Sequence, residues 1–170
     1  MSLSAKLSLL ALVIFALDIL TKCFTHHYLP PMELSSPFYP YGGIGVFKDF
    51  LGVEFSIAHR TNTGAAWGFF ADYPIALLVL RIFLVGGLAF YLFTLNAGHS
   101  WRIPLVLVLV GAVGNILDFF LYGHVVDMFH FILWGYDYPV FNIADTAIFV
   151  GVAWLIFLTL FERNSCASAP

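Results

Sequence analysis

The chain has 170 residues, of which 61% are hydrophobic and only 10% are charged. Soluble domains carry about 25% charged residues, so this composition excludes an ordinary water-soluble fold. The net charge of −3 is small and is not gathered in an acidic or basic run, which argues against nucleic acid as a partner. A chain of this length forms one domain, and we expect a single integral membrane domain over residues 1–170.

Four long apolar segments predict four transmembrane helices, at residues 7–24, 74–95, 103–122 and 140–161. A helix of roughly 18 residues reaches roughly 27 Å, close to the ~30 Å hydrocarbon core of a bilayer. A cleaved signal peptide would need small residues before its cleavage site, and Lys22 occupies such a position. We therefore expect the first helix to be retained.

The distribution of basic residues predicts which side of the membrane each end occupies. Four spans place both termini on one side, and Lys6, Arg102 and Arg163 fall on that side, whereas residues 123–139 contain no Lys or Arg. Short loops rich in Lys and Arg stay in the cytoplasm. We therefore expect cytoplasmic termini and a large extracytoplasmic loop at residues 25–73.

Two features stand out within this outer loop. Apolar residues alternate with polar or small ones at Val53, Phe55 and Ile57. This period of two predicts a half-buried β-strand. Just before the second span come the aromatic residues Trp67, Phe69, Phe70 and Tyr73. Aromatic rings suit the headgroup layer, and either interfacial anchoring or contact with a substrate would explain them.

Ionisable side chains inside apolar segments are costly, so each is a candidate for function. They are Asp18, Lys22, Arg81, Asp118 and Asp145, with Asp127 near a helix end. Asp18 and Lys22 are spaced i,i+4, which predicts a local ion pair more readily than a chemical role. Asn115 and Asp118 share nearly one helix face, which predicts a structural polar cluster between helices.

Asp127 and Asp145 form the pair that best suits catalysis. Asp127 follows the third span and Asp145 lies about one turn inside the fourth, so a short connection would let them converge near the outer face. Two close carboxyls share a proton, and such a pair can activate water and protonate a peptide carbonyl. The alternatives are that Asn142 and Asp145 form a capping box and that Asp127 is a solvated loop acid.

Other functions find less support in the sequence. The six histidines show no metal-binding spacing, since His124 and His130 are six apart and no H-E-x-x-H motif occurs, so we expect no metal and no cofactor. A small transporter or proton-coupled carrier using intramembrane acids is the main alternative. It would make Asp18 or Lys22 as essential as Asp127. A structural subunit of a larger membrane complex is a third possibility.

Several segments, taken in order, resemble the motifs of the signal peptidase II family, the lipoprotein signal peptidases. They are residues 18–22 (DILTK), 62–67 (NTGAAW), 114–118 (GNILD), 123–127 (GHVVD) and 141–146 (FNIADT). Each motif alone is weak, but their order, spacing and membrane placement agree over most of the chain. The ordered set is therefore specific.

The resemblance implies an aspartic endopeptidase of the bacterial inner membrane that needs no metal. It would cut prolipoproteins just before their diacylglyceryl-modified cysteine, using Asp127 and Asp145. Residues that would bind substrate or position this pair are Asn62, Gly64, Asn115, Asp118 and Asn142. The implied fold is an all-α membrane protein of four transmembrane helices, with a small extracytoplasmic β-cradle and an interfacial helix. We expect a monomer whose partners are prolipoprotein substrates and membrane lipids.

One departure from the family pattern has a structural consequence. The family usually places Arg directly after the aspartate of the third motif, and here that residue is Phe119. Arg81 and Asp118 would lie at similar depths, roughly 10 and roughly 13 Å from the outer face by helical rise. We therefore predict that Arg81 pairs with Asp118, the alternative being that Arg81 extends toward the headgroups.

Overall fold

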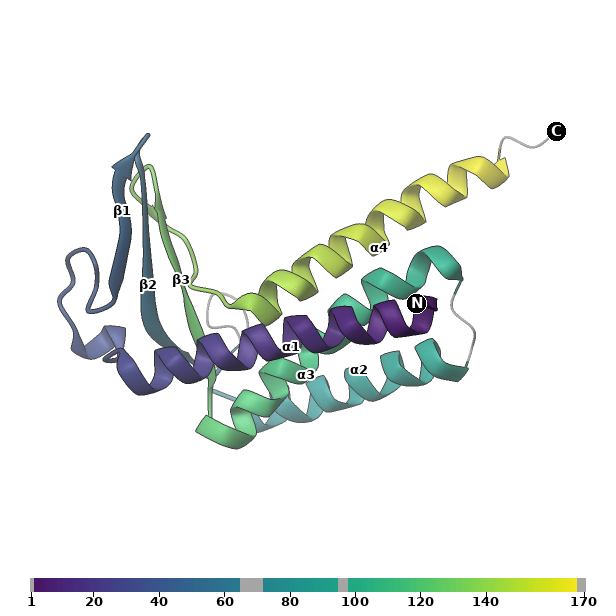
Figure 1. The fold of residues 1–170 in the computed structure, drawn as a ribbon, viewed down its shortest axis with the longest axis horizontal. Helices are drawn as coiled ribbons and strands as arrows, with labels where there is room; N and C mark the ends of the chain where they lie inside the picture. The colour runs from purple at the N-terminus through teal and green to yellow at the C-terminus, as the bar shows by residue number, and fades with distance from the viewer. Residues whose placement is uncertain (1, 65–71, 95–97, 168–170) are drawn as a thin grey trace.

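The computed structural model describes residues 2–64, 72–94 and 98–167. A group of long helices occupies most of the molecule, and an antiparallel sheet stands at one end of it (Figure 1). The predicted interfacial helix and three of the aromatic residues assigned to the interface, Trp67, Phe69 and Phe70, fall at or around residues 65–71, which lie outside the described residues.

All four apolar segments are helices, as predicted. They are α1 (Leu3–Tyr28), α2 (Pro74–Thr94), α3 (Arg102–Tyr122) and α4 (Ile143–Ala167). Each contains a stretch long and apolar enough to cross a membrane. The first helix extends beyond the predicted segment 7–24 at both ends, and its C-terminal end reaches the sheet.

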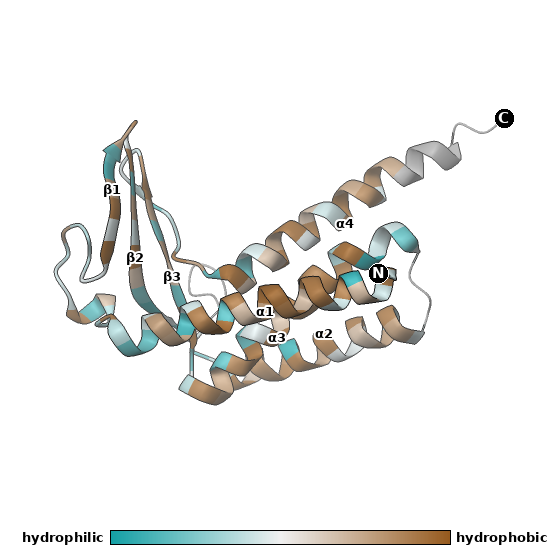
Figure 2. Cartoon of the chain, in the orientation of Figure 1, coloured by the Kyte–Doolittle hydropathy of each residue, from teal (hydrophilic) through white to brown (hydrophobic). Residues whose placement is uncertain are grey.

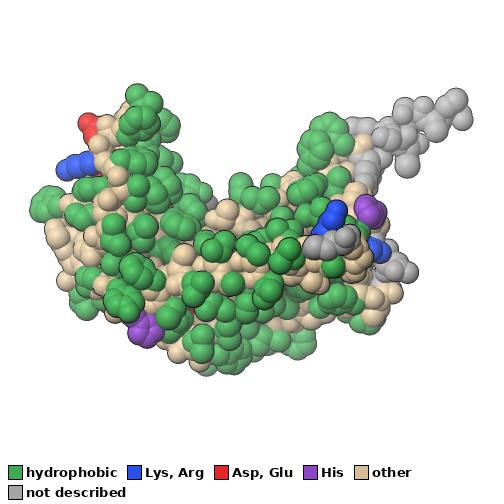
Figure 3. Space-filling model, viewed as in Figure 1, with side chains coloured by type: hydrophobic (Ala, Val, Ile, Leu, Met, Phe, Trp, Pro, Cys, Tyr) green, Lys and Arg blue, Asp and Glu red, His purple; other side chains and the backbone are tan. Residues whose placement is uncertain are grey.

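The helices turn large apolar side chains outward rather than burying them. Leu12, Leu20 and Phe83 are 63%, 65% and 74% exposed. Hydrophobic residues dominate all four helices in Figure 2, and on the face shown in Figure 3 the Lys and Arg side chains lie only toward the two ends of the molecule. A hydrophobic middle between polar ends is the pattern that a bilayer requires.

The sheet has four antiparallel strands in the order β1-β2-β3-β4. They are β1 (Ile44–Phe50), β2 (Val53–Asn62), β3 (Val125–Leu133) and β4 (Tyr136–Asp137). The strand predicted around Phe55 is β2, which is longer than expected. The prediction of a simple short loop at residues 123–139 was wrong, because β3 and β4 lie there and β3 pairs with β2 across the sequence.

Two glycines let the helices approach closely where α3 meets its neighbours. A Cβ atom on Gly114 would lie 2.7 Å from an Asp18 carboxylate oxygen, and one on Gly111 would lie 2.8 Å from Ile148 Cγ1. Small residues at helix contacts allow such packing in membranes. Helix α3 ends at Tyr122, and the next residue, Gly123, has a φ of 78° that turns the chain toward β3.

Candidate active site

Asp127 and Asp145 meet where the sheet joins the helices, but Asp127 is not at a helix end as predicted. It lies on β3, opposite Arg60 of β2, and is 1% exposed. Helix α3 stops at Tyr122, so the residues after it are extended. Asp145 lies in the first turn of α4 and is partly exposed. We call Asp127 and Asp145 the carboxyl pair.

Asn142 joins the two members of the carboxyl pair. Its side-chain Nδ2 donates to Asp127 Oδ1 at 2.7 Å, while its Oδ1 accepts from the Asp145 backbone N–H at 2.8 Å. The Asn142 backbone N–H in turn donates to Asp145 Oδ2 at 3.4 Å. This is the capping box that the sequence suggested as an alternative. The same residues therefore begin α4 and hold the carboxyl pair together.

Two further amides fix the remaining carboxylate oxygens. Asn62 Nδ2 donates to Asp127 Oδ2 at 3.0 Å, and Asn115 Nδ2 donates to Asp145 Oδ1 at 2.7 Å. The Asn62 side chain is itself held, because its Oδ1 accepts from the Gly64 backbone N–H at 3.0 Å. Sequence analysis singled out all four of these neighbours. Asn62 comes from β2, Gly64 from the segment after it and Asn115 from α3, while Asn142 directly precedes α4.

A buried lysine lies behind the carboxyl pair. Lys22 Nζ is 2.7 Å from a carboxylate oxygen of Asp18 and 2.7 Å from one of Asp118, and it donates to Asn115 Oδ1 at 3.0 Å. The local Asp18–Lys22 pair is therefore confirmed and extends to a second carboxylate on α3. We call Asp18, Lys22 and Asp118 the lysine cluster.

The lysine cluster also anchors the backbone around the site. Asp18 Oδ1 accepts from the Ala144 N–H at 2.8 Å, which satisfies a free donor in the first turn of α4. Asp118 Oδ2 accepts from the Val126 N–H at 3.3 Å, next to Asp127. Lys22 has 0% exposure, and a buried charge of this kind must be paired. Two carboxylates around one ammonium meet that requirement.

The predicted ion pair between Arg81 and Asp118 was wrong, since none joins them among the described residues. Asp118 is already paired with Lys22, so Phe119 does not leave it without a cation. Arg81 donates instead to the Gly64 carbonyl oxygen at 2.9 Å and is attracted electrostatically by Asp145 and Asp127. Helical rise estimates a position along the α2 axis, but it does not give the direction that a side chain takes around that axis.

The surroundings of Asp127 favour its protonated form. Burial, reinforced by the Asp145 carboxylate, raises the pKa of Asp127 to about 8, although hydrogen bonds from Asn62 and Asn142 act in the opposite direction. The surroundings therefore favour a state in which the carboxyl pair shares one proton. This is the condition for a pair in which one carboxyl donates a proton and the other accepts one.

A pocket of about 450 Å³ opens beside Asp127. Asn62, Gly64 and Asp127 form one part of its wall, and Tyr138 and Pro139, before α4, form another. A flexible chain entering this pocket would reach Asp127 directly. The arrangement thus combines an accessible space with two braced carboxyl groups.

Three histidines that sequence spacing did not connect also come together nearby. They are His26 of α1, His59 of β2 and His124 of the turn before β3, and one ligand atom of each lies within 4.8 Å of the other two. Their sequence separations are too long to form a recognised motif, so only the fold reveals them. The histidine spacing in the sequence gave no sign of this proximity, which depends on contacts between distant segments.

Known proteins resemble the chain over most of its length. Residues 10–161 match the family described as signal peptidase (SPase) II. The lipoprotein signal peptidase of Chlamydia pneumoniae is 40% identical over 113 residues, which cover 65% of this chain and 67% of the relative. That of Xylella fastidiosa strain M12 is 30% identical over 167 residues, covering 95% and 92%.

Two solved structures, each described as a bacterial membrane enzyme, share the fold. One superposes with a TM-score of 0.79 at 24% identity and covers 98% of this chain and 94% of its own. The other has a TM-score of 0.72 at 26% identity, with 92% and 93% covered. Given the family match across residues 10–161 and the relatives that share it, the chain belongs to the signal peptidase II family of peptidases.

Proposed function

We propose that this chain is an aspartic endopeptidase that removes the signal peptide from diacylglyceryl-modified prolipoproteins, cutting just before the lipid-modified cysteine. The observation that carries the proposal is the carboxyl pair, braced by Asn142, Asn115 and Asn62 beside a pocket. Family membership supplies the substrate class, because the relatives carry the name lipoprotein signal peptidase.

The two carboxyl groups divide the chemistry between them. Asp127, which keeps its proton at neutral pH, donates that proton to the carbonyl oxygen of the scissile peptide bond. Asp145 takes a proton from a water molecule, whose oxygen then bonds to the carbonyl carbon. A tetrahedral diol results, and Asp145 now carries the proton.

Collapse of this intermediate reverses the two roles. Asp145 gives its proton to the peptide nitrogen as the C–N bond breaks, and a hydroxyl of the diol returns a proton to Asp127. The products are a carboxylic acid and an amine, and the pair regains its starting state. Both steps need the carboxyl groups in fixed positions, which the three asparagines provide.

Several neighbouring residues act by positioning rather than by touching the reacting atoms. Asn115 connects the Lys22 ammonium to Asp145, so the lysine cluster orients the pair from behind. Arg81 holds the Gly64 carbonyl, and Gly64 in turn holds Asn62.

The proposal includes a placement in the membrane. The chain would be a monomeric single domain of the bacterial inner membrane, with both termini in the cytoplasm and the sheet on the outside. Lys6, Arg102 and Arg163 at the cytoplasmic side support this orientation. The carboxyl pair, at the junction of sheet and helices, would then face signal peptides on the outer side.

Cysteine labelling tests this placement. In a variant whose native cysteines are replaced, a membrane-impermeant thiol reagent applied to intact cells lacking an outer membrane should label a cysteine at position 53. A cysteine at position 166 should be labelled only after the membrane is permeabilised. Labelling of position 166 and protection of position 53 in intact cells would refute the orientation.

The direct test of function uses purified protein in detergent and a prolipoprotein carrying the diacylglyceryl group. We expect a decrease in substrate size and a product whose N-terminal residue is the lipid-modified cysteine. The same prolipoprotein without the lipid should remain uncut. Failure to cut the modified substrate, or cleavage at another bond, would contradict the proposal.

A further inference from the structure

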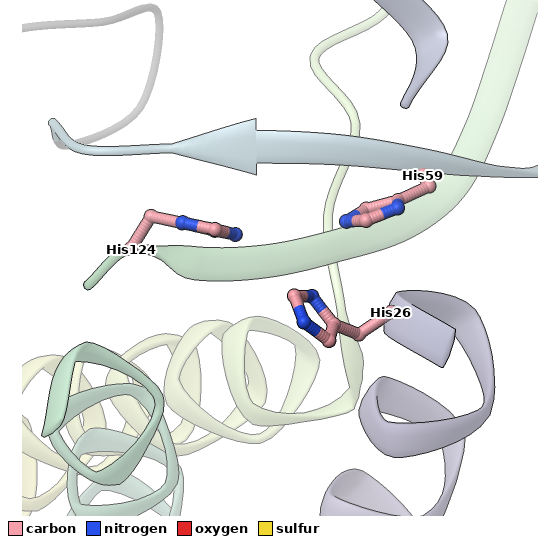
Figure 4. Close-up of side chains that lie close together, drawn as sticks. All are labelled: His26, His59 and His124. Carbon is pink, nitrogen blue, oxygen red and sulfur yellow. The ribbon is translucent and has the colours of Figure 1, made fainter. Parts of the chain in front are cut away.

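Outside the carboxyl pair, the most unusual group of side chains is formed by His26, His59 and His124, which we call the histidine cluster. Figure 4 shows their three rings gathered around a common space, with His26 reaching it from α1 and the other two from the sheet side. One ring nitrogen of each lies within 4.8 Å of the other two. Such convergence of imidazoles from distant parts of the chain calls for an explanation.

The hydrogen bonds identify which ring nitrogens are free. His26 Nδ1, His59 Nε2 and His124 Nε2 are buried and have no hydrogen-bond partner. His59 Nδ1 lies 3.0 Å from the Leu29 carbonyl oxygen, which can only accept, so Nδ1 carries the proton and Nε2 presents a lone pair.

Free lone pairs in a buried place are unfavourable unless something binds them. His59 is only 3% exposed, and a buried polar atom without a partner costs about 1–3 kcal/mol. A histidine that binds a metal usually donates its other ring N–H to a backbone carbonyl, which fixes the ring. His59 shows this arrangement with Leu29.

We infer that the histidine cluster is a binding site for a divalent transition-metal ion, with Zn²⁺ the best-suited candidate. Neutral imidazoles suit Zn²⁺, Ni²⁺ and Cu²⁺. Three nitrogens at about 2.0–2.1 Å from a tetrahedral ion are about 3.3 Å apart, so small ring rotations bring these nitrogens to binding distance. A water molecule would fill the fourth position of a tetrahedral ion.

The place of the cluster suggests a structural role for the ion. His26 follows Lys22 by one helical turn, His59 precedes Asn62 by three residues, and His124 precedes Asp127 by three. A bound ion would thus tie α1, β2 and the start of β3 together beside the carboxyl pair without touching it. This site is independent of the peptidase chemistry proposed above.

Cobalt is the first probe, because tetrahedral Co²⁺ absorbs visible light whereas Zn²⁺ does not. The full chain would be purified without a histidine tag, stripped with a chelator and titrated with Co²⁺. We expect one Co²⁺ per chain, displacement by Zn²⁺, and a thermal midpoint that rises with the Zn²⁺ concentration. Absence of stoichiometric binding in the wild-type chain would overturn the inference.

Substitutions then locate the site. His59→Gln and His124→Gln should each weaken Co²⁺ binding at least tenfold, whereas His99→Gln should bind like the wild type. His99 is exposed and lies in η3 (His99–Trp101), at the opposite end of α3. Equal binding by all four proteins would place the metal elsewhere and refute the assignment.

A control for folding keeps the result interpretable. Each variant should still cleave the modified prolipoprotein without metal at temperatures well below its thermal midpoint, which shows that it is folded. The stripped wild-type chain should cleave at the same rate as the Zn²⁺-loaded chain. Loss of cleavage on stripping, restored by Zn²⁺, would overturn the purely structural role.

Discussion

Two groups of polar side chains lie where the sheet meets the helices, and they differ in how completely their atoms are hydrogen-bonded. Around the carboxyl pair, both oxygens of Asp127 and both oxygens of Asp145 accept hydrogen bonds. In the histidine cluster, one buried nitrogen of each ring has no partner. A complete network fixes its geometry before any ligand arrives, whereas an incomplete one indicates a ligand still to be bound.

The two groups also differ in charge. Near the carboxyl pair, the acidic groups are balanced by Lys22 inside the lysine cluster and by Arg81 at the side. The histidine cluster contributes lone pairs rather than fixed charges. This difference in charge supports our proposals that the first group transfers protons and that the second binds a cation. Each experiment below tests one side of this contrast.

The largest effect is expected from changing the carboxyl pair itself. Asp127→Asn and Asp145→Asn keep the shape of the side chain but remove the exchangeable proton, so each should lower the cleavage rate by about 10³-fold or more. The measurement is single-turnover cleavage of the modified prolipoprotein. Near-wild-type rates in either variant would exclude that residue from catalysis.

A matched control is available on β1. Asp49 is an exposed aspartate with a φ of 55°, a conformation that Asn also tolerates. Asp49→Asn should therefore leave both the cleavage rate and the thermal midpoint unchanged. A similar loss in this control would show that the substitutions act through something other than the pair.

The next largest effect should follow from removing the buried ammonium. Lys22→Met leaves Asp18 and Asp118 without their cation, and breaking a buried ion pair in this way costs about 3–5 kcal/mol of stability. Thermal unfolding in detergent should show a large drop. The exposed Lys6→Met, at the far end of α1, should show none.

A second substitution sharpens this experiment. Lys22→Met leaves the carboxylates of Asp18 and Asp118 buried without a cation. In the double variant with Asp118→Asn, one of these two carboxylates is replaced by a neutral amide, so part of the lost stability should return. Strictly additive losses would mean that Lys22 and Asp118 do not interact. Such a result would contradict the lysine cluster.

A smaller effect is expected where α3 packs against α1. Gly114→Ala would place a methyl group 2.7 Å from an Asp18 oxygen, which requires the lysine cluster to shift. Overpacking of this kind costs about 1–3 kcal/mol. Gly86→Ala on α2 is the control, because nothing lies within 4 Å of the added atom. Equal midpoints for the two variants would show that the close approach is unimportant.

Much of the fold could be predicted from the sequence because lipid imposes simple rules. Long apolar segments must be helices, since every backbone group needs an internal partner. The capping box at Asn142 and Asp145 was also visible, because its signal is local. By contrast, β3 pairs with β2 about 70 residues away, and no local pattern in 123–139 distinguished it from a loop.

The side-chain network shows the same division between local and distant contacts. The pair Asp18–Lys22 was predictable from an i,i+4 spacing, but the second carboxylate on Lys22 was not, since Asp118 comes from another helix. Arg81 was given the wrong partner, since it donates to the Gly64 carbonyl oxygen. Helical rise fixes the position along the axis, whereas rotation about the axis depends on packing.

The last prediction concerns how the cleavage rate depends on pH. Little change is expected near neutral pH, and the effect appears only at higher pH. Asp127 is protonated below about pH 8, so the rate should fall above that pH, by roughly tenfold per unit, as the pair loses its shared proton. The raised pKa also affects the free energy of unfolding, because the folded state holds this proton more tightly than the unfolded state. The stability that this carboxyl contributes is fully present below pH 3.8, the ordinary pKa, and is lost as the pH rises toward 8. A flat rate profile to pH 10 would argue against a protonated Asp127.

The proposed mechanism requires Asp127 to keep a proton beside Asp145, and infrared spectroscopy of the purified protein observes that proton directly. A difference titration from pH 6 to pH 10 should show one protonated-carboxyl band that disappears near pH 8. The band should be missing from Asp127→Asn and present in Asp49→Asn. An unchanged band in Asp127→Asn, or no protonated carboxyl at pH 7 in the wild type, would contradict the account.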